Sequence, residues 1–556
     1  MTPSRPTVLR SPFAPLFVLF FVLTATACPR ADGPNVDAGP ETDLPFGADQ
    51  TLIDDEGTLD GRGIDATGPH DSRTDDVATR DADPRDLVSS DLLAADLGSP
   101  CSGNLNGTLD DRQAYSQVLR CLADPLVSTA TKRATIDAFV NLVEARDGFP
   151  IVDGGRVIFV YVDDPRWDVD DDTLHDEDYD PARRKPPLRV AGSFNQWNTQ
   201  GLALMHAGLG FYHLDTAISG ATSTARYSYK FIAKNAQGQD VWFSDPLSRR
   251  FGYDTFGRYA LIRGGIDTSG KAIGHLEWIR NIPSKVLGGV NRKIYIYVPR
   301  NYDSPGAKTT HYPVLYLQDG NNAFDPHQPH SNGTWDADGV ADHEIETGMA
   351  KEMIIVAIPN NAHRIEEYTP VADIITSGGQ PVGGHGDLYV DYLVKELKPV
   401  IDARYRTFAD KDHTAILGSS LGGLIAFHAG LRYPAVFKYV GGMSSTLAWG
   451  TFGLHNTTTP QSYAAIANLL GRHQVYYLDS GGGPPCPPGS DNYCETLAFH
   501  DQLIAQGIST LPQDPNVWPI QPPNVNLYYH HEAGAQHNEA AWNQRLYRAL
   551  RVFFRP

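Results

Sequence analysis

Residues 413–424 have the sequence HTAILGSSLGGL, and this stretch decides the fold that we expect. A short apolar strand runs into the pattern Gly-x-Ser-x-Gly at residues 418–422, and residues 424–429 then continue as a helix. This strand–turn–helix setting lifts a serine onto the tip of a sharp turn. The glycines of the motif are needed because side chains there would collide with the neighbouring strand and helix. Ser420 is therefore a candidate nucleophile.

Two backbone N–H groups are candidates for stabilising a negatively charged oxygen beside this serine. One belongs to Leu421, which opens the helix, where the first turn carries partial positive charge. The other is expected in the sequence DGNN, residues 319–322, directly after an apolar strand. Gly320 and Asn321 are both candidates in that loop, and we take Asn321 as the expected second donor.

A serine nucleophile needs a base, and His537 is the candidate for that role. It lies in the loop AGAQHNE, residues 533–539, between a strand and a helix, and it follows the serine in chain order as this fold requires. His530 and His531 lie inside the preceding strand, where they point to opposite faces. The spacing of the three histidines is not typical of a metal site, so the sequence predicts neither a metal nor another cofactor.

Two carboxylates compete for the third position of the triad. Asp491 lies on a loop before a helix, whereas Asp479 lies at the end of the strand over residues 474–479. Cys486 and Cys494 are expected to form a disulfide that holds the loop of Asp491. We favour Asp491 and keep Asp479 as the alternative; the carboxylate that is not used is expected to bind loop N–H groups.

The remainder of the C-terminal half predicts an α/β fold. Residues 292–299, 312–320 and 353–359 are nearly continuous apolar strands, and residues 388–403 have the apolar spacing of a helix. Such strands, alternating with helices, indicate a mostly parallel sheet that is covered on both faces.

The middle of the chain has a different pattern. Short strands with period-two alternation and Gly or Asn turns begin near residue 156, as expected for an immunoglobulin-like β-sandwich. Two helices, over residues 110–122 and 131–146, precede it. Cys101 and Cys121 flank the first helix, and we expect a disulfide between them.

The N-terminus predicts export from the cytoplasm. Residues 1–28 combine two arginines, an apolar segment too short to span a bilayer comfortably, and small residues before Cys28. They resemble a bacterial lipoprotein signal with Cys28 as the lipidation site; the alternative is an ordinary signal peptide. Residues 29–100 contain 18 acidic residues and five arginines, a net charge of −13, and are expected to be a disordered linker.

Composition excludes one class of partner. The 556 residues carry a net charge of −20, whereas nucleic-acid binding requires basic surface. Membrane contact is expected only through a lipid anchor, with the protein in the cell envelope or outside the cell. The predicted segments are a signal (1–28), a linker (29–100), helices (101–150), a sandwich (151–270) and a hydrolase (271–556).

The C-terminal half, from about residue 274, resembles the putative-esterase (esterase D-like) family of α/β-hydrolases. That family includes enterochelin, feruloyl and acetylxylan esterases and the antigen 85 acyltransferases. The matching motifs are residues 315–324 (LYLQDGNNAF), 401–407 (IDARYRT), 418–423 (GSSLGG) and 533–539 (AGAQHNE). The Pro-rich insertion with Cys486 and Cys494 departs from the family pattern.

The sandwich region, residues 152–265, resembles domains found beside glycogen-active enzymes, of the isoamylase N-terminal and glycogen-binding type. The matching residues are Val190, 192–195 (GSFN), Trp197, 229–231 (YKF) and Asp245-Pro246. In that family, Trp and Lys at such positions contact glucan, which implies a glucan contact through this domain. The alternative is a structural partner domain with Trp197 in its core.

These observations predict a serine esterase that works through an acyl-enzyme. The loops 322–343 and 362–386 are polar and rich in Gly and His, which favours a polar ester of the carbohydrate, feruloyl or siderophore type, small or polymeric. The alternatives are an acyltransferase to a carbohydrate and a glucan-binding envelope protein with a vestigial hydrolase.

Overall fold

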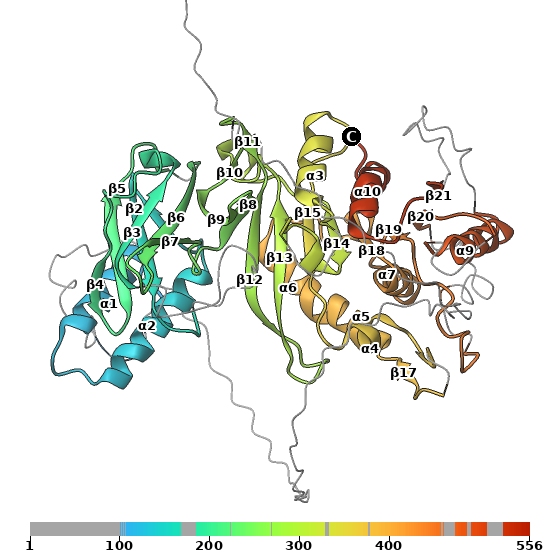
Figure 1. Cartoon of the computed structure of the whole chain (residues 1–556), viewed down its shortest axis with the longest axis horizontal. Coiled ribbons are helices and arrows are strands. Elements are labelled where there is room, and N and C mark those ends of the chain that lie inside the picture. Colours follow the sequence, from blue (N-terminus) through green and yellow to red (C-terminus); the bar gives the residue numbers. More distant parts are fainter. Residues whose placement is uncertain are drawn as a thin grey trace, which may run out of the picture. The chain divides into compact units, whose positions relative to one another are not determined.

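The computed structural model describes residues 101–556 except 102, 104, 106, 168–184, 223, 268, 328–332, 376–377, 457–459, 461–472, 486–490 and 509–525. The predictions for the signal, the linker, Cys28 and Cys486 lie outside the described residues. All described residues belong to one compact unit, Pro69–Pro556 (Figure 1). No helix among them is long and apolar enough to cross a membrane.

One long mixed sheet runs through this unit in the order β21-β20-β19-β18-β14-β15-β13-β12-β8-β9-β6-β3, and β7 also pairs with β6. Strands β14, β15 and β18 to β21 are parallel to one another, and the other pairs are antiparallel. The parallel strands are β14 (Val314–Gln318), β15 (Ile354–Ile358), β18 (Thr414–Ser419), β19 (Tyr439–Met443), β20 (Val475–Ser480) and β21 (Leu527–His531). The others are β3 (Lys185–Gly192), β6 (Arg226–Lys234), β7 (Asp240–Phe243), β8 (Arg250–Asp254), β9 (Gly257–Arg263), β12 (His275–Pro283) and β13 (Asn291–Val298).

Helices cover both faces of the parallel half, because its strands alternate apolar side chains to either side. Val314 and Tyr316 belong to one apolar cluster, and Leu315 and Leu317 to the other. The first cluster includes residues of α5 (Gly386–Tyr392), α6 (Lys398–Arg404), α7 (Leu421–Arg432) and α9 (Tyr493–Ala505). The second includes residues of α3 (Ala337–Glu346) and α10 (Glu539–Phe553). This arrangement confirms the predicted α/β class of the C-terminal half.

One predicted helix is interrupted. The single helix expected over residues 388–403 consists of α5, a π-helical turn over Leu393–Leu397, and α6. Pro399 lies in the first turn of α6. Proline has no N–H to donate to the preceding turn, so the regular hydrogen-bond ladder cannot continue through this position.

The N-terminal region has a second sheet, in the order β1-β2-β5-β4. Its β2 (Arg156–Val162) is buried on both sides, against helices on one face and against the end of the long sheet on the other. The helices are α1 (Asp111–Ala123) and α2 (Thr129–Glu144), blue in Figure 1. The other strands are β1 (Ile151–Asp153), β4 (Met205–Gly208) and β5 (Phe211–Ala217). A disulfide joins Cys101 to Cys121 in α1.

The facing sheets do not form a separate pair, because one of them continues into the parallel half. Leu276 of β12 pairs with Phe251 of β8, so hydrogen bonds link the two halves into one sheet. The immunoglobulin-like assignment stays a prediction. The remaining elements are short: α4 (Arg364–Tyr368) and the hairpins β10 (Gly265–Ile266) with β11 (Ala272–Ile273) and β16 (Ala372–Asp373) with β17 (Val382–Gly383).

Candidate active site

The candidate residues gather because parallel strands end at the same edge of a sheet. In the register of the sheet, Ser419 lies beside Met443, Met443 beside Asp479, and Asp479 beside His530. Ser420 directly follows β18, Asp491 follows β20 and His537 follows β21. Loops after the carboxyl ends of strands form binding sites in open α/β sheets.

Ser420 lies on a strained turn between β18 and α7. Its backbone has φ 53° and ψ −124°, a conformation that side chains rarely adopt and that places this serine at the tip of the turn. The turn needs glycine on either side: a Cβ at Gly418 would lie 2.4 Å from the carbonyl of Gly422, and one at Gly422 would lie 2.8 Å from the Asp319 carboxylate. The local sequence therefore determines this geometry.

His537 and Asp491 form the hydrogen bond expected of a base and its orienting acid. The distance from His537 Nδ1 to Asp491 Oδ1 is 2.7 Å. The Asp491 side chain is completely buried, whereas the imidazole is 33% exposed and lies edge-on to Trp542. The buried carboxylate can hold the ring in one orientation while a third of the imidazole side chain remains exposed.

Asp479 is the carboxylate that does not contact His537, and its contacts differ from those expected for it. It accepts a hydrogen bond from the Tyr477 hydroxyl at 2.9 Å and lies 3.3 Å from the guanidinium of Arg545. The expectation that it binds loop N–H groups is wrong, because its strand position turns it toward α10. The Gly481 N–H donates to Asp491 instead.

Burial raises the pKa of Asp479 to about 6, and Asp491 adds to this rise, whereas Arg545 and Tyr477 oppose it.

Two residues that the sequence analysis did not single out complete the surroundings of Asp491. Ser444 Oγ donates to Asp491 Oδ2 at 2.7 Å and accepts from Trp542 Nε1 and Arg545 Nη2. Arg545 lies on the face of α10 that also carries buried Trp542 and Leu546. A charged residue in such an apolar stripe was the signal that could have pointed to it.

The hydroxyl of Ser420 is hydrogen-bonded to Thr446 and not to His537. It lies 3.3 Å from Thr446 Oγ1, which also accepts from Asn492 Nδ2. Among the hydrogen bonds of the described residues, none joins Ser420 directly to His537. Catalytic hydrogen bonds often form fully only with substrate bound.

The two candidate oxyanion donors belong to Leu421 and Asn321. Leu421 is the first residue of α7, where an N–H has no acceptor within the helix. Asn321 lies in the 3₁₀ turn Gly320–Asn322 after β14. The preceding Asp319 is held by Arg364, with Nε–Oδ1 and Nη2–Oδ2 distances of 2.7 and 2.8 Å.

The residues that carry the glucan resemblance are mostly internal. Lys230 is buried and donates to the carbonyl of Phe256, while Tyr229 donates to the buried Asp245. Trp197 is 38% exposed, with its ring centre 6.1 Å from that of Trp242. The Trp197 side chain is thus exposed enough to contact a ligand, whereas the Lys230 side chain is not.

The second predicted disulfide is only partly within the described residues. Cys494, in the first turn of α9, is disulfide-bonded, whereas its predicted partner Cys486 lies outside them. The pairing of Cys486 with Cys494 stays a prediction.

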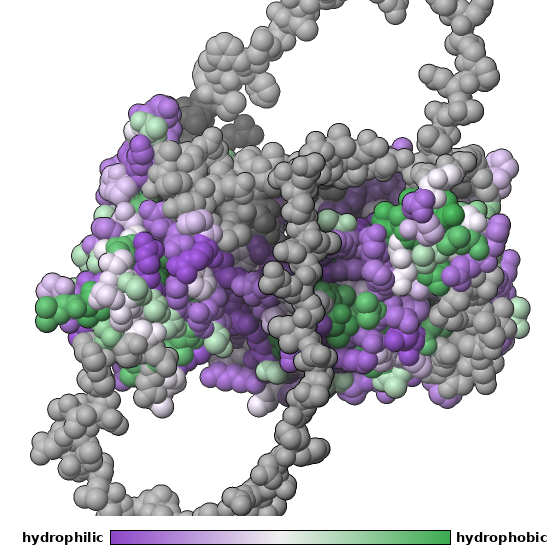
Figure 2. All heavy atoms as spheres, turned by 90° about the horizontal axis from the view of Figure 1, so that it is seen from below, coloured by the Kyte–Doolittle hydropathy of each residue, from purple (hydrophilic) through white to green (hydrophobic). Residues whose placement is uncertain are grey.

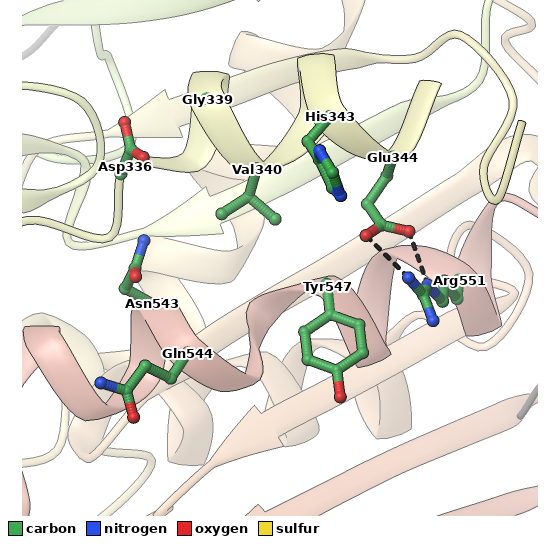
Figure 3. Close-up of a pocket in the computed structure, with 9 residues that line it drawn as sticks. All are labelled: Asp336, Gly339, Val340, His343, Glu344, Asn543, Gln544, Tyr547 and Arg551. Atoms are coloured by element: carbon green, nitrogen blue, oxygen red, sulfur yellow. Dashed lines mark hydrogen bonds and ion pairs between the residues drawn. The ribbon is translucent and has the colours of Figure 1, made fainter. Parts of the chain in front are cut away.

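One open pocket of the described residues lies away from these residues, between α3 and α10 (Figure 3). It has a volume of about 440 Å³, and the ion-paired Glu344 and Arg551 are among the residues that line it. None of the candidate site residues lines it.

On the face shown in Figure 2, hydrophobic residues form separate patches among larger hydrophilic areas.

Comparison with known proteins assigns a family to the region that contains these residues. Residues 284–553 match the model of the family described as "Putative esterase". Residues 284–553 are an esterase-family domain. This match confirms the resemblance to the putative-esterase family seen in the sequence.

Individual relatives are distant. The chain is 28% identical over 160 residues to the uncharacterized protein YbbA of Bacillus subtilis, covering 28% of this chain and 57% of YbbA. It is also 28% identical over 168 residues to esterase Rv1288 of Mycobacterium tuberculosis, covering 30% of each chain. The aligned stretches thus cover only 57% and 30% of the length of these two curated relatives.

A solved IroE-like serine hydrolase from Shewanella oneidensis overlaps 50% of this chain and 80% of its own, at 20% identity and a TM-score of 0.39.

Proposed function

We propose that this protein is a serine esterase in which Ser420, His537 and Asp491 form the catalytic triad. The observation that carries the proposal is the 2.7 Å hydrogen bond between His537 and the buried Asp491, at the sheet edge where Ser420 lies on its strained turn. The esterase family of residues 284–553 supports the reaction class.

The proposed mechanism transfers the acyl group in two steps. His537 Nε2 takes the proton of the Ser420 hydroxyl while Ser420 Oγ attacks the ester carbonyl. The N–H groups of Leu421 and Asn321 stabilise the resulting oxyanion. His537 then protonates the leaving alcohol, and water hydrolyses the acyl-enzyme by the same route. For the attack, the Ser420 hydroxyl must turn from Thr446 toward His537.

The test is labelling and turnover with a matched serine control. Ser420→Ala should abolish labelling by a fluorophosphonate and lower kcat for p-nitrophenyl acetate by at least about 10³-fold, because the nucleophile is lost. Ser419→Ala is the control, since Ser419 is the buried neighbour at the end of β18. Near-normal turnover in Ser420→Ala would refute the proposal.

We further propose a polar ester as substrate. The loops around the site carry Asp319, Asn360 and Arg364 in one hydrogen-bonded group, and Arg364 is 30% exposed. These donors and acceptors favour hydroxyl-rich or catechol-like alcohols over lipids. Rates for aryl acetates, feruloyl sugars and catecholate esters would rank these classes, and products formed with added sugar acceptors would reveal acyl transfer.

The N-terminal sequence supports a location in the cell envelope or outside the cell. Incorporation of labelled fatty acid into the native chain, and its loss in Cys28→Ser, would test lipid anchoring. The exposed Trp197 supports a glucan contact, which a pull-down with glucan and Trp197→Ala would test.

A further inference from the structure

A single buried cation lies between two buried carboxylates behind the candidate site. The Arg545 side chain is completely buried, as are those of Asp479 and Asp491. Its Nε is 3.3 Å from Asp479 Oδ1, and its Nη2 is 3.4 Å from Asp491 Oδ2. Nη2 also donates to Ser444 Oγ at 3.0 Å, which in turn donates to Asp491.

Asp491 and Asp479 use their remaining hydrogen bonds differently. Asp491 is bound by His537, Ser444 and the Gly481 N–H, so most of its contacts stabilise the ionised form. Asp479 has the hydroxyl of Tyr477 besides Arg545. Asp479 is therefore the carboxylate whose charge depends most on Arg545.

The charged groups that face this cluster come from several elements. Strand β20 contributes Asp479 and the neutral Tyr477, and α10 contributes Arg545 and Arg548. From β21 and the loop after it come His530 and Glu532. Burial, Arg548 and Arg545 hold the pKa of His530 at about 4, so it is neutral where an esterase with a histidine base works.

The arrangement balances the charge that His537 experiences. An ionised Asp491 favours the protonated imidazole, whereas a lone Arg545 behind it would oppose that protonation. An ionised Asp479 cancels the effect of Arg545. A weaker base removes the proton of serine less effectively, so the balance bears directly on turnover.

We propose that Asp479 and Arg545 are a positioning pair for the triad proposed above: Arg545 and Ser444 hold Asp491 against His537, and Asp479 cancels the charge of Arg545 so that His537 stays basic. This inference rests on the proposed function. Neither residue touches substrate, and both act through Asp491.

The test compares pH profiles of kcat/KM for p-nitrophenyl acetate in Asp479→Asn and in Asp479→Asn/Arg545→Met. In Asp479→Asn the uncompensated Arg545 should move the acidic limb down by about 0.5 to 1 pH unit and lower the plateau about two- to threefold. The profiles of wild type and variant, each scaled to its plateau, should therefore separate at low pH. Removing Arg545 as well should return the limb to within about 0.3 pH unit of wild type.

A merely structural role would not produce this pattern. Glu277→Gln is the matched control, because it neutralises a buried carboxylate paired with arginines far along the sheet; it should leave the limb unchanged. An unshifted limb in Asp479→Asn, or no return in the double variant, would overturn the inference. If the variants fold poorly, Arg545→Lys, which keeps the charge, should retain the wild-type limb.

The His537 ring can also be titrated directly by NMR in selectively labelled protein. Asp479→Asn should lower the pKa of His537 and the double variant should restore it, whether or not an ester is hydrolysed. Wild type without turnover or Ser420 labelling would refute the proposed function. An unchanged His537 titration in active Asp479→Asn would refute only the positioning pair.

Discussion

Two clusters of buried acid and arginine lie on the same long sheet, and they are built with opposite charge ratios. Behind the candidate site, one guanidinium serves the two carboxylates Asp479 and Asp491. At the junction of the two halves, the single carboxylate of Glu277 has Arg249 at 2.6 Å and Arg250 at 3.2 Å. His275 and the Tyr405 hydroxyl also contact it.

The difference shows in how firmly each acid holds its charge. Burial opposes ionisation of Glu277, but Arg249 and Arg250 outweigh it and hold its pKa well below the usual value. Burial dominates at Asp479, whose pKa is raised to about 6. Two arginines thus keep Glu277 ionised at the junction of the two halves. A single arginine shared by two carboxylates leaves Asp479, which lies next to the candidate triad, able to change its protonation state with pH.

The largest expected effect separates the two acids behind the site. Asp491→Asn should lower kcat for p-nitrophenyl acetate by about 10³- to 10⁴-fold, because the amide cannot hold the imidazole in the required tautomer. Asp479→Asn should stay within about threefold at its plateau. Steady-state kinetics above pH 7 measures both, and equal losses would mean that the two carboxylates share one role.

The next effect concerns the junction. Glu277→Ala should lower the free energy of unfolding by about 3 to 5 kcal/mol, because two buried guanidinium groups lose their counter-ion. Urea unfolding followed by fluorescence measures the loss. The fraction that remains folded should keep normal kcat, and a loss of turnover without a loss of stability would contradict the separation of the two clusters.

The pH dependence of stability should have opposite signs in the two clusters. The raised pKa of Asp479 means that the folded state binds more protons than the unfolded state between about pH 4 and 6. Its contribution therefore destabilises the fold as pH rises through this window, by roughly 3 kcal/mol in all. Glu277, with its lowered pKa, contributes stability above about pH 4.5 that is lost in stronger acid.

Unfolding free energies of wild type and Asp479→Asn at pH 5 and pH 7.5 provide the measurement. The wild type should gain stability relative to the variant at pH 5, and the contribution of His530 cancels because both proteins contain it. A constant difference between the two proteins would show that Asp479 has an ordinary pKa.

The smallest effect compares two hydroxyl groups. Tyr477→Phe removes one of two partners of Asp479, whereas Tyr405→Phe removes one of four partners of Glu277. Tyr477→Phe should therefore cost about 1 kcal/mol more in unfolding free energy. Thermal and urea unfolding of the pair would measure it, and an equal cost would mean that the number of partners does not matter.

Much of the candidate site could be predicted from local sequence patterns. Ser420 could be predicted because an apolar strand, a glycine-bounded turn and a helix are neighbours in the chain. His537 could be predicted because its loop follows a strand in the required chain order. The prediction of one helix over residues 388–403 followed the apolar spacing and missed the interruption, for which Pro399 was the available sequence signal.

The choice between Asp479 and Asp491 is of another kind, because Asp479 lies at the end of β20 and Asp491 lies in the segment that follows it, so chain order alone does not separate them. The sequence by itself determined the α/β class, the position of Ser420 and the loop of His537, since each depends on neighbouring residues. Only the tertiary structure decided which carboxylate meets the imidazole, that Ser444 and Arg545 complete the cluster, and that β8 joins β12 into one sheet. Those contacts join residues up to about a hundred positions apart, and only the packing of separate elements brings such side chains together.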